Sequence, residues 1–145
     1  MKIYWAGPLF TTAERAWNRF MVEALRKNGH DVFLPQEDEP REKTAESIFE
    51  HDVDGLETSD VVVAVVDGAD PDSGTSWEIG YAYSIGMPIV LVRTDFRGRH
   101  EGVALPPINI MLAESANEVV YVEIDKDPVI PILKALDKLN EVRML

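Results

Sequence analysis

The chain has 145 residues, enough for one compact domain that we expect to span residues 1–145, and 46% of them are hydrophobic, enough for a full core. Its formal net charge of −12, from 26 acidic against 14 basic residues, disfavours DNA, RNA and anionic membranes as partners. It contains no cysteine, which excludes disulfides, thiolate zinc sites and a cysteine nucleophile.

Five short apolar runs, rich in β-branched and aromatic residues, are predicted to form strands. The run Val61–Val66 is apolar on both faces, which is typical of a central strand with helices on each side. In chain order the predicted strands are Lys2–Ala6, Asp31–Leu34, Val61–Val66, Ile89–Val92 and Val119–Val122.

Helix signals separate these strands. Thr11 and Glu14 have the spacing of a capping box, and Gly29 suits the C-terminal end of the helix that they begin. No apolar run approaches the length of a membrane-spanning helix, and we expect a cytoplasmic protein. After this first helix, the predicted helices are Thr44–Glu57, Thr75–Ile85, a short one following Pro106 and Pro107, and Pro128–Val142.

The alternation of strands and helices predicts an α/β fold with a parallel sheet and right-handed crossovers. Five strands in a chain of this length indicate a flavodoxin-like, doubly wound sheet of order 2-1-3-4-5 with helices on both faces. Ligands of such sheets bind beyond the carboxyl ends of the strands, where the strand order reverses. This places Tyr4–Phe10 and Asp67–Glu78 at the expected site, between the first and third strands.

The segment Asp67–Glu78 is acidic, since it contains Asp67, Asp70, Asp72 and Glu78 but no lysine or arginine. These acids would repel a phosphate group, so a neutral ligand or a developing cation fits better. A carboxylate is useful in N-glycoside cleavage, because it stabilises the oxocarbenium-like transition state or attacks the anomeric carbon. No spacing of His, Asp and Glu resembles a metal site.

Glu78 has two interpretations from the sequence. In the first turn of the predicted helix, the helix N-terminus would favour its ionised form, which suits a nucleophile. Alternatively, Thr75 and Glu78 form a capping box in which the carboxylate reaches back to the Thr75 amide.

Structural interpretations also exist for the other candidates. Asp72 follows Pro71, which is ordinary turn chemistry, and Tyr4 on a central strand is expected to pack in the core. Asp52 and Asp54 are expected on a solvated face of the second helix.

Four segments of the chain resemble the nucleoside 2-deoxyribosyltransferase family, and the similarity runs from Lys2 to about Leu112. The third is the most specific, with an acid, then Gly-Thr, then Glu-x-Gly-x-Ala at fixed spacing. The segments are Ile3–Pro8, Asp52–Asp60, Asp72–Ala82 and Leu105–Leu112.

The resemblance implies roles for individual residues. Glu78 matches the nucleophile that forms a deoxyribosyl-enzyme, and Tyr4 matches the tyrosine whose hydroxyl holds that carboxylate. Asp72 matches the acid that binds the 5′-hydroxyl of the sugar. Asp52 matches an acid near the departing base, which donates a proton to the base or orients it.

Three further residues are expected to bind substrate. Gly7 and Gly74 belong to the matching segments beside Tyr4 and Glu78. Asn109 matches an asparagine that reaches the site of a neighbouring subunit, so the resemblance implies a homo-oligomer with shared sites. It further implies 2′-deoxynucleosides and free nucleobases as substrates, transfer of the sugar between bases, and no metal or organic cofactor.

Two alternatives remain from the sequence. Relatives that hydrolyse 2′-deoxynucleoside 5′-monophosphates typically lack the acid six residues before the nucleophile; here Asp72 is present, which favours nucleosides. The second alternative is a non-catalytic nucleotide- or flavin-binding module, since this fold carries many functions. A flavin site needs a glycine- and hydroxyl-rich phosphate loop after the first strand, and Gly7–Thr12 matches that pattern poorly.

Overall fold

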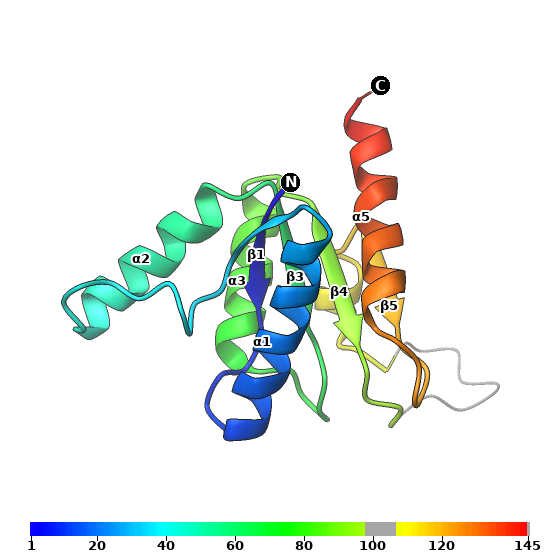
Figure 1. Ribbon diagram of the computed structural model, residues 1–145, viewed down its shortest axis with the longest axis horizontal. Coiled ribbons are helices and arrows are strands. Elements are labelled where there is room, and N and C mark those ends of the chain that lie inside the picture. Colours follow the sequence, from blue (N-terminus) through cyan, green and yellow to red (C-terminus); the bar gives the residue numbers. More distant parts are fainter. Residues whose placement is uncertain (98–106, 145) are drawn as a thin grey trace.

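The computed structural model describes residues 1–97 and 107–144, which form a parallel sheet flanked by helices (Figure 1). The strands are β1 (Lys2–Ala6), β2 (Asp31–Phe33), β3 (Val61–Val65), β4 (Ile89–Arg93) and β5 (Glu118–Tyr121). The helices are α1 (Thr12–Lys27), α2 (Ala45–Glu57), α3 (Ser73–Ser84), α4 (Ile110–Ala113) and α5 (Val129–Arg143).

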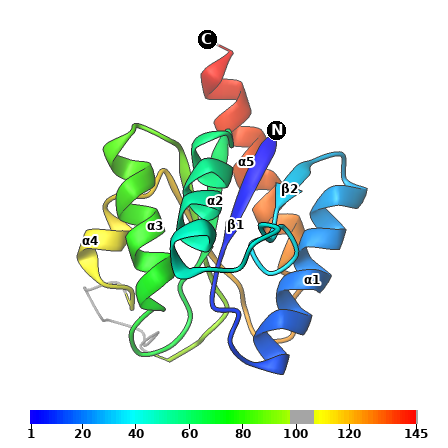
Figure 2. The same ribbon diagram turned by 90° about the vertical axis from the view of Figure 1, so that its left-hand side faces the viewer.

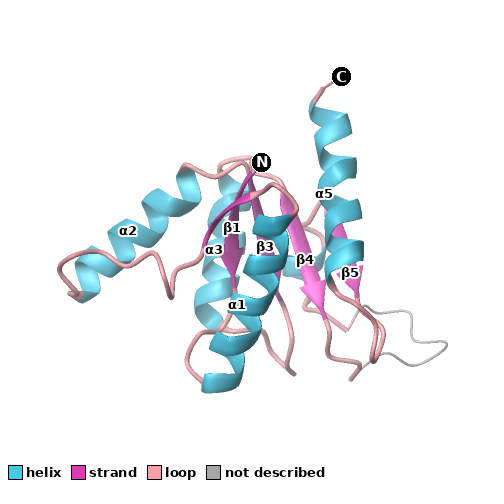
Figure 3. Ribbon diagram, in the orientation of Figure 1, coloured by secondary structure: helices cyan, strands magenta, loops and turns pink. Residues whose placement is uncertain are grey.

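The sheet has the order β2-β1-β3-β4-β5, and every neighbouring pair is parallel, which confirms the predicted flavodoxin-like topology. In the register between β1 and its two neighbours, Tyr4 lies opposite Phe33 of β2 and Val62 of β3. The strand arrows point the same way, so the loops that follow them gather at one edge of the sheet (Figure 3). The order reverses between β1 and β3.

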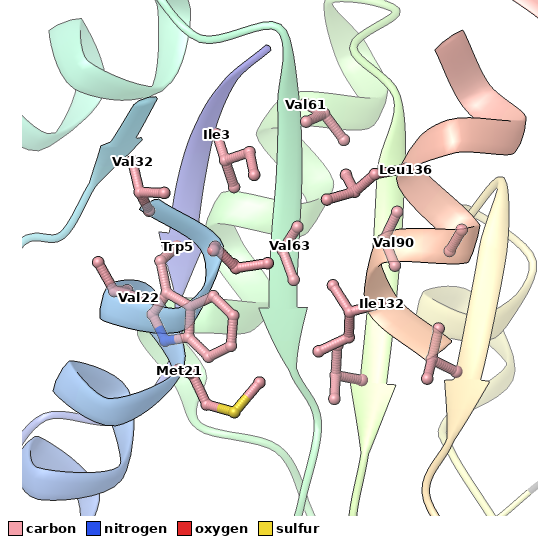
Figure 4. Close-up of a cluster of buried hydrophobic side chains, with 14 of the residues drawn as sticks. Ile3, Trp5, Met21, Val22, Val32, Val61, Val63, Val90, Ile132 and Leu136 are labelled. Atoms are coloured by element: carbon pink, nitrogen blue, oxygen red, sulfur yellow. The ribbon is translucent and has the colours of Figure 1, made fainter. Parts of the chain in front are cut away.

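Helices cover both faces of the sheet, as predicted (Figure 2). Alternate residues of β3 enter two separate cores: Val61 and Val63 face α1 and α5, whereas Val62 and Ala64 face α2 and α3. This explains why the whole run is apolar in the sequence. In the first core, side chains of α1 and α5 lie against the sheet (Figure 4). They include Met21, Val22, Ile132 and Leu136.

Most element ends lie within a residue or two of the prediction. The capping box of Thr11 and Glu14 is present, and Gly29 follows α1 with a φ of +86°, in the left-handed region that glycine favours. The start of α3 is two residues earlier than predicted, at Ser73 and not at Thr75, and this shift changes the position of Glu78 in the helix.

Two further expectations concern the loops and membranes. Leu105 and Pro106, at the start of the fourth matching segment, lie outside the described residues. Within residues 1–97 and 107–144, no helix is both long and apolar enough to cross a bilayer.

Two isoleucines of α5 allow the contribution of the first core to be measured. Ile132 is fully buried, whereas Ile130 is 54% exposed. We expect Ile132→Ala to lower the free energy of unfolding by about 2–5 kcal/mol, because it removes packed methyl groups and leaves a cavity. The control Ile130→Ala changes the same residue type in the same helix and should cost well under half as much. Urea denaturation of both variants measures the difference, and equal losses would contradict the assignment of this core.

Candidate active site

A cavity of about 330 Å³ opens at the carboxyl ends of β1 and β3, where the strand order reverses. Its walls come from the loops after β1 and β2, from α2, and from the start of α3. The lining residues are Gly7, Leu9, Phe10, Pro35, Gln36, Glu39, Pro40, Lys43, Ile48, Asp52, Asp72, Gly74, Thr75 and Glu78.

A hydrogen bond joins β1 to α3 in this site. The hydroxyl of Tyr4 donates to Oε1 of Glu78 over 2.7 Å, although the two residues are 74 positions apart in the sequence. Tyr4 is fully buried, and this burial raises the pKa of its hydroxyl above the ordinary value, so the group remains a donor. Tyr4 therefore packs in the core and also holds a carboxyl group of the cavity.

The environment of Glu78 differs from the predicted one. Because α3 begins at Ser73, Glu78 lies in its second turn, and no acidic residue lies in the first turn. Burial raises the pKa of Glu78 to about 7; the hydrogen bond from Tyr4 opposes this shift, and the charges of Asp52 and Asp72 add to it. The expectation that the helix N-terminus keeps Glu78 ionised was wrong, because the effect of the helix dipole is confined to the first turn.

The capping box predicted for Thr75 and Glu78 is also absent. Asp72 caps α3 instead: its Oδ2 accepts hydrogen bonds from the Thr75 amide over 2.9 Å and from the Thr75 hydroxyl over 3.1 Å. Aspartate is among the preferred N-cap residues, so the helix starts two positions earlier than predicted. The carboxyl group of Glu78 is left free of a capping role and turns to Tyr4.

Asp72 combines a structural role with a place in the cavity wall. Both hydrogen bonds described for its carboxylate end on Oδ2, so within the described chain Oδ1 retains its capacity to accept. Gly74, the next wall residue, has no Cβ; one placed there would lie 3.2 Å from Oδ2. Gly7 also lines the cavity, where a Cβ would lie 3.3 Å from the Val65 side chain.

Asp52 lies on the inner side of α2. It is half-buried and shares the cavity with Glu78, and burial raises its pKa to about 6 against the opposing charge of His51. The expectation of a solvated helix face is therefore wrong for Asp52, although it holds for the exposed Asp54.

Asn109 is the predicted site residue that the fold leaves apart from the others. It is exposed and caps the short helix α4, where its side-chain oxygen accepts a hydrogen bond from the Met111 amide over 2.9 Å. It lines neither this cavity nor the one described next.

A second cavity, of about 360 Å³, adjoins the first and shares Ile48, Asp52, Gly74 and Glu78 with it. Its remaining walls are mostly apolar and lie between α2 and α3. They are formed by Tyr4, Ala45, Phe49, Val53, Leu56 and Trp77. The carboxyl groups of Asp52 and Glu78 thus lie where two largely apolar cavities meet, in agreement with burial as the main cause of both pKa shifts.

The sequence led to no assigned role for any residue in the cavity wall that follows β2. Gln36 is buried, and its side-chain amide accepts from Asn18 and donates to the Arg15 carbonyl. Lys43 forms an ion pair with Glu39 in the same wall, so a cation lines the cavity even though Asp67–Glu78 contains none. The signal was available in the topology, because β2 is the neighbour of β1 and its carboxyl end lies at the same edge.

The arrangement suits chemistry with two carboxyl groups. A carboxylate held by a tyrosine hydroxyl can attack or stabilise an electrophilic carbon, and a second carboxyl of raised pKa can exchange a proton. In the described ranges, 1–97 and 107–144, no three potential ligand side chains come together as a metal site.

Fold and cavity together define a doubly wound α/β protein with a cavity lined by several acidic residues at the switch point of its sheet. The sequence model of the nucleoside 2-deoxyribosyltransferase family matches residues 3–117, and the chain belongs to this family.

Solved structures share the fold of this chain. A conserved protein from Enterococcus faecalis V583 is 30% identical, with a TM-score of 0.72 over 83% of this chain and 91% of the other. A 2-deoxyribosyltransferase from Bacillus psychrosaccharolyticus is 27% identical, with a TM-score of 0.67 over 90% and 96%. A CMP N-glycosidase from Clostridium botulinum shares the fold, at 22% identity and a TM-score of 0.55 over 94% and 99%. A comparison with curated proteins found no match. Family and neighbours support a nucleoside-processing enzyme.

The raised pKa of Glu78 has a consequence for stability. Because the folded-state pKa of about 7 exceeds the ordinary value of 4.5, the folded chain binds more protons than the unfolded chain between these two pH values. Stability contributed by this group is therefore present below pH 4.5 and is lost as the pH rises through 7. We expect Glu78→Gln to be more stable than the parent chain above pH 7, by up to about 3 kcal/mol, and to lose this advantage towards pH 4.5.

Urea denaturation across this pH range measures the effect. Glu23→Gln, which alters an exposed glutamate of α1, is the control and should change the free energy of unfolding by less than about 0.5 kcal/mol. If the difference between Glu78→Gln and the parent does not vary with pH, the pKa of Glu78 is not raised.

Proposed function

We propose that this chain transfers the 2-deoxyribosyl group of 2′-deoxynucleosides from one nucleobase to another, with Glu78 as the nucleophile. The observation that carries the proposal is the hydrogen bond from Tyr4 to Glu78 inside a cavity that Asp52 and Asp72 also line. Membership of the family supports it independently.

The proposed reaction is a double displacement. An ionised Oε atom of Glu78 attacks C1′, the C1′–N bond breaks, and its electron pair leaves with the base, which takes a proton from Asp52. A second base then attacks C1′ on the face that the first one left, its proton passes to Asp52, and Glu78 is released as a carboxylate. Two inversions retain the β configuration. These steps need no metal or organic cofactor, because side chains supply the nucleophile and the proton.

Asp72 supports a nucleoside over a nucleotide substrate. Its Oδ1 atom is available to accept a hydrogen bond from the 5′-hydroxyl, whereas a 5′-phosphate would meet a like charge in a partly buried site. Hydrolysis of 2′-deoxynucleoside 5′-monophosphates is the second candidate. The cation of Lys43 in the opposite wall and the shared fold of the CMP N-glycosidase favour it.

Other parts of the proposal concern the protein's setting. Asn109 is exposed at the start of α4, which is compatible with a contact to a neighbouring subunit's site in a homo-oligomer. Salvage of nucleosides in the cytoplasm is the role that the proposed reaction would serve.

Incubation of the protein with deoxyinosine and free adenine tests the transfer directly. We expect deoxyadenosine and hypoxanthine by chromatography, and we expect Glu78→Ala to lower the rate by about 10³-fold or more, because no other side chain replaces the nucleophile. Glu23→Ala removes an exposed glutamate and should retain full activity.

The other outcomes separate the alternatives. Hypoxanthine with free deoxyribose alone would identify a hydrolase, and activity confined to deoxynucleoside monophosphates would mean that Asp72 is wrongly assigned. A protein inactive on both substrate classes would favour a binding module.

The two raised pKa values predict the pH dependence of kcat/KM. Glu78 must be ionised to attack and Asp52 must be protonated to donate, so we expect a bell-shaped profile with flanks near pH 6 and pH 7. The two groups interact, and each flank belongs to the pair. Asp52→Asn should remove the alkaline flank and leave one acidic flank, which reports the ionisation of Glu78 alone. An alkaline flank that persists in this variant would show that Asp52 is not the proton donor.

A further inference from the structure

We propose that Phe33 and Gly55 are positioning residues that hold the Tyr4 ring where its hydroxyl meets Glu78. The inference rests on the proposed function for its catalytic consequence. The geometry behind it comes from the contacts of β2 and α2 with β1, outside the cavity walls.

Phe33 covers the ring of Tyr4 from the neighbouring strand. The two residues are paired in the parallel register, and their rings stack with centroids 5.4 Å apart and planes 12° apart. Since β2 is the edge strand of the sheet and has three residues, Phe33 is its last side chain beside Tyr4. The stack limits the tilt of the Tyr4 ring, and this tilt determines where the hydroxyl points.

Gly55 allows the Phe33 ring to pack closely against α2. A Cβ at position 55 would lie 2.5 Å from Cζ, 2.6 Å from Cε2 and 2.7 Å from Cε1 of Phe33, far inside van der Waals contact. The φ of Gly55 is not positive, so its backbone does not require glycine. A glycine within a helix is unfavourable relative to alanine, and close approach to the Phe33 ring is the physical reason for it here.

His51 extends the contact along α2. Its ring lies 5.6 Å from that of Phe33, and it stands four residues before Gly55, so both lie on one face of the helix. The next residue, Asp52, lines the cavity. Figure 1 shows α2 extending away from the sheet, so the contact of Phe33 with α2 helps to fix the position of the helix. Phe33 therefore joins the strand that carries Tyr4 to the helix that carries Asp52.

Phe33 lines neither of the two cavities, so it is not expected to touch substrate. A residue that only packs would affect stability, whereas a positioning residue changes the behaviour of Glu78. The hydrogen bond from Tyr4 lowers the pKa of Glu78 against the effect of burial. Loosening the stack should therefore raise the pH at which Glu78 ionises.

Phe33→Leu and Gly55→Ala test the inference by two independent changes. We expect each to lower kcat by about 10-fold or more with KM changed less than about 2-fold, and to move the alkaline flank of the pH profile, which lies near the Glu78 pKa of about 7, upward, as Tyr4→Phe should. Within Tyr4→Phe, the added Phe33→Leu change should have little further effect on kcat, because both act through one hydrogen bond. The controls are Phe20→Leu, an exposed residue of α1, and Gly80→Ala, where a Cβ would meet nothing within 4 Å.

Direct titration of Glu78 by carboxyl NMR gives a readout without turnover. A raised pKa in both folded variants supports the inference, even if the chain proves inactive as a transferase. An unchanged pKa and kcat in folded Phe33→Leu and Gly55→Ala would show plain packing, and a rise in KM at constant kcat would show substrate contact; either overturns it. If Phe33→Leu does not fold, Phe33→Met and Gly55→Ala are judged by the same criteria. Full activity of Glu78→Ala would instead overturn the proposed function.

Discussion

The hydrogen bond between Tyr4 and Glu78 is the interaction on which the site depends. It joins β1 to α3 across the reversal of strand order, where the topology opens a cavity. A half-buried carboxyl group is costly to ionise, and a hydrogen bond to the charged form offsets part of that cost. A fully buried tyrosine is suited to this task, because burial raises the pKa of its hydroxyl and keeps it a donor at every pH at which Glu78 titrates.

The start of α3 determines how Glu78 is held. With Asp72 as the N-cap, the helix begins at Ser73, and Glu78 moves beyond the reach of the helix dipole. Its pKa then depends on burial, on Tyr4 and on the neighbouring carboxyl groups. With Thr75 as the N-cap, the carboxyl group of Glu78 would have accepted a hydrogen bond from a backbone amide at the start of the helix. The choice between two capping residues three positions apart therefore decides whether Glu78 supports the helix or faces the cavity.

The sequence predicted the fold well and the site unevenly, for physical reasons. The apolar run of β3, which is buried on both faces, and the capping box at Thr11 are local sequence patterns. The strand order could be predicted because the rules for right-handed connections leave few possible topologies. Glu78, the hydrogen-bond partner of Tyr4, is 74 residues away in the sequence, so no local sequence pattern indicates this hydrogen bond. The resemblance to a family indicated that contact, whereas the residues alone favoured packing. The wall after β2, with Gln36 and Lys43, is irregular and has no periodicity to read.

The convergence of acids on one cavity connects the energetics of the site to the proposed chemistry. Asp52 and Asp72 both raise the pKa of Glu78, so their mutual repulsion destabilises the ionised site when it is empty. In the proposed reaction, positive charge develops at C1′ as the base departs, and this charge then meets Glu78, Asp72 and the carboxylate that Asp52 becomes on giving up its proton. An unfavourable interaction in the free enzyme is replaced by a favourable one in the transition state, so the site is more complementary to the oxocarbenium-like state than to a neutral nucleoside. The net charge of −12 extends this field beyond the cavity.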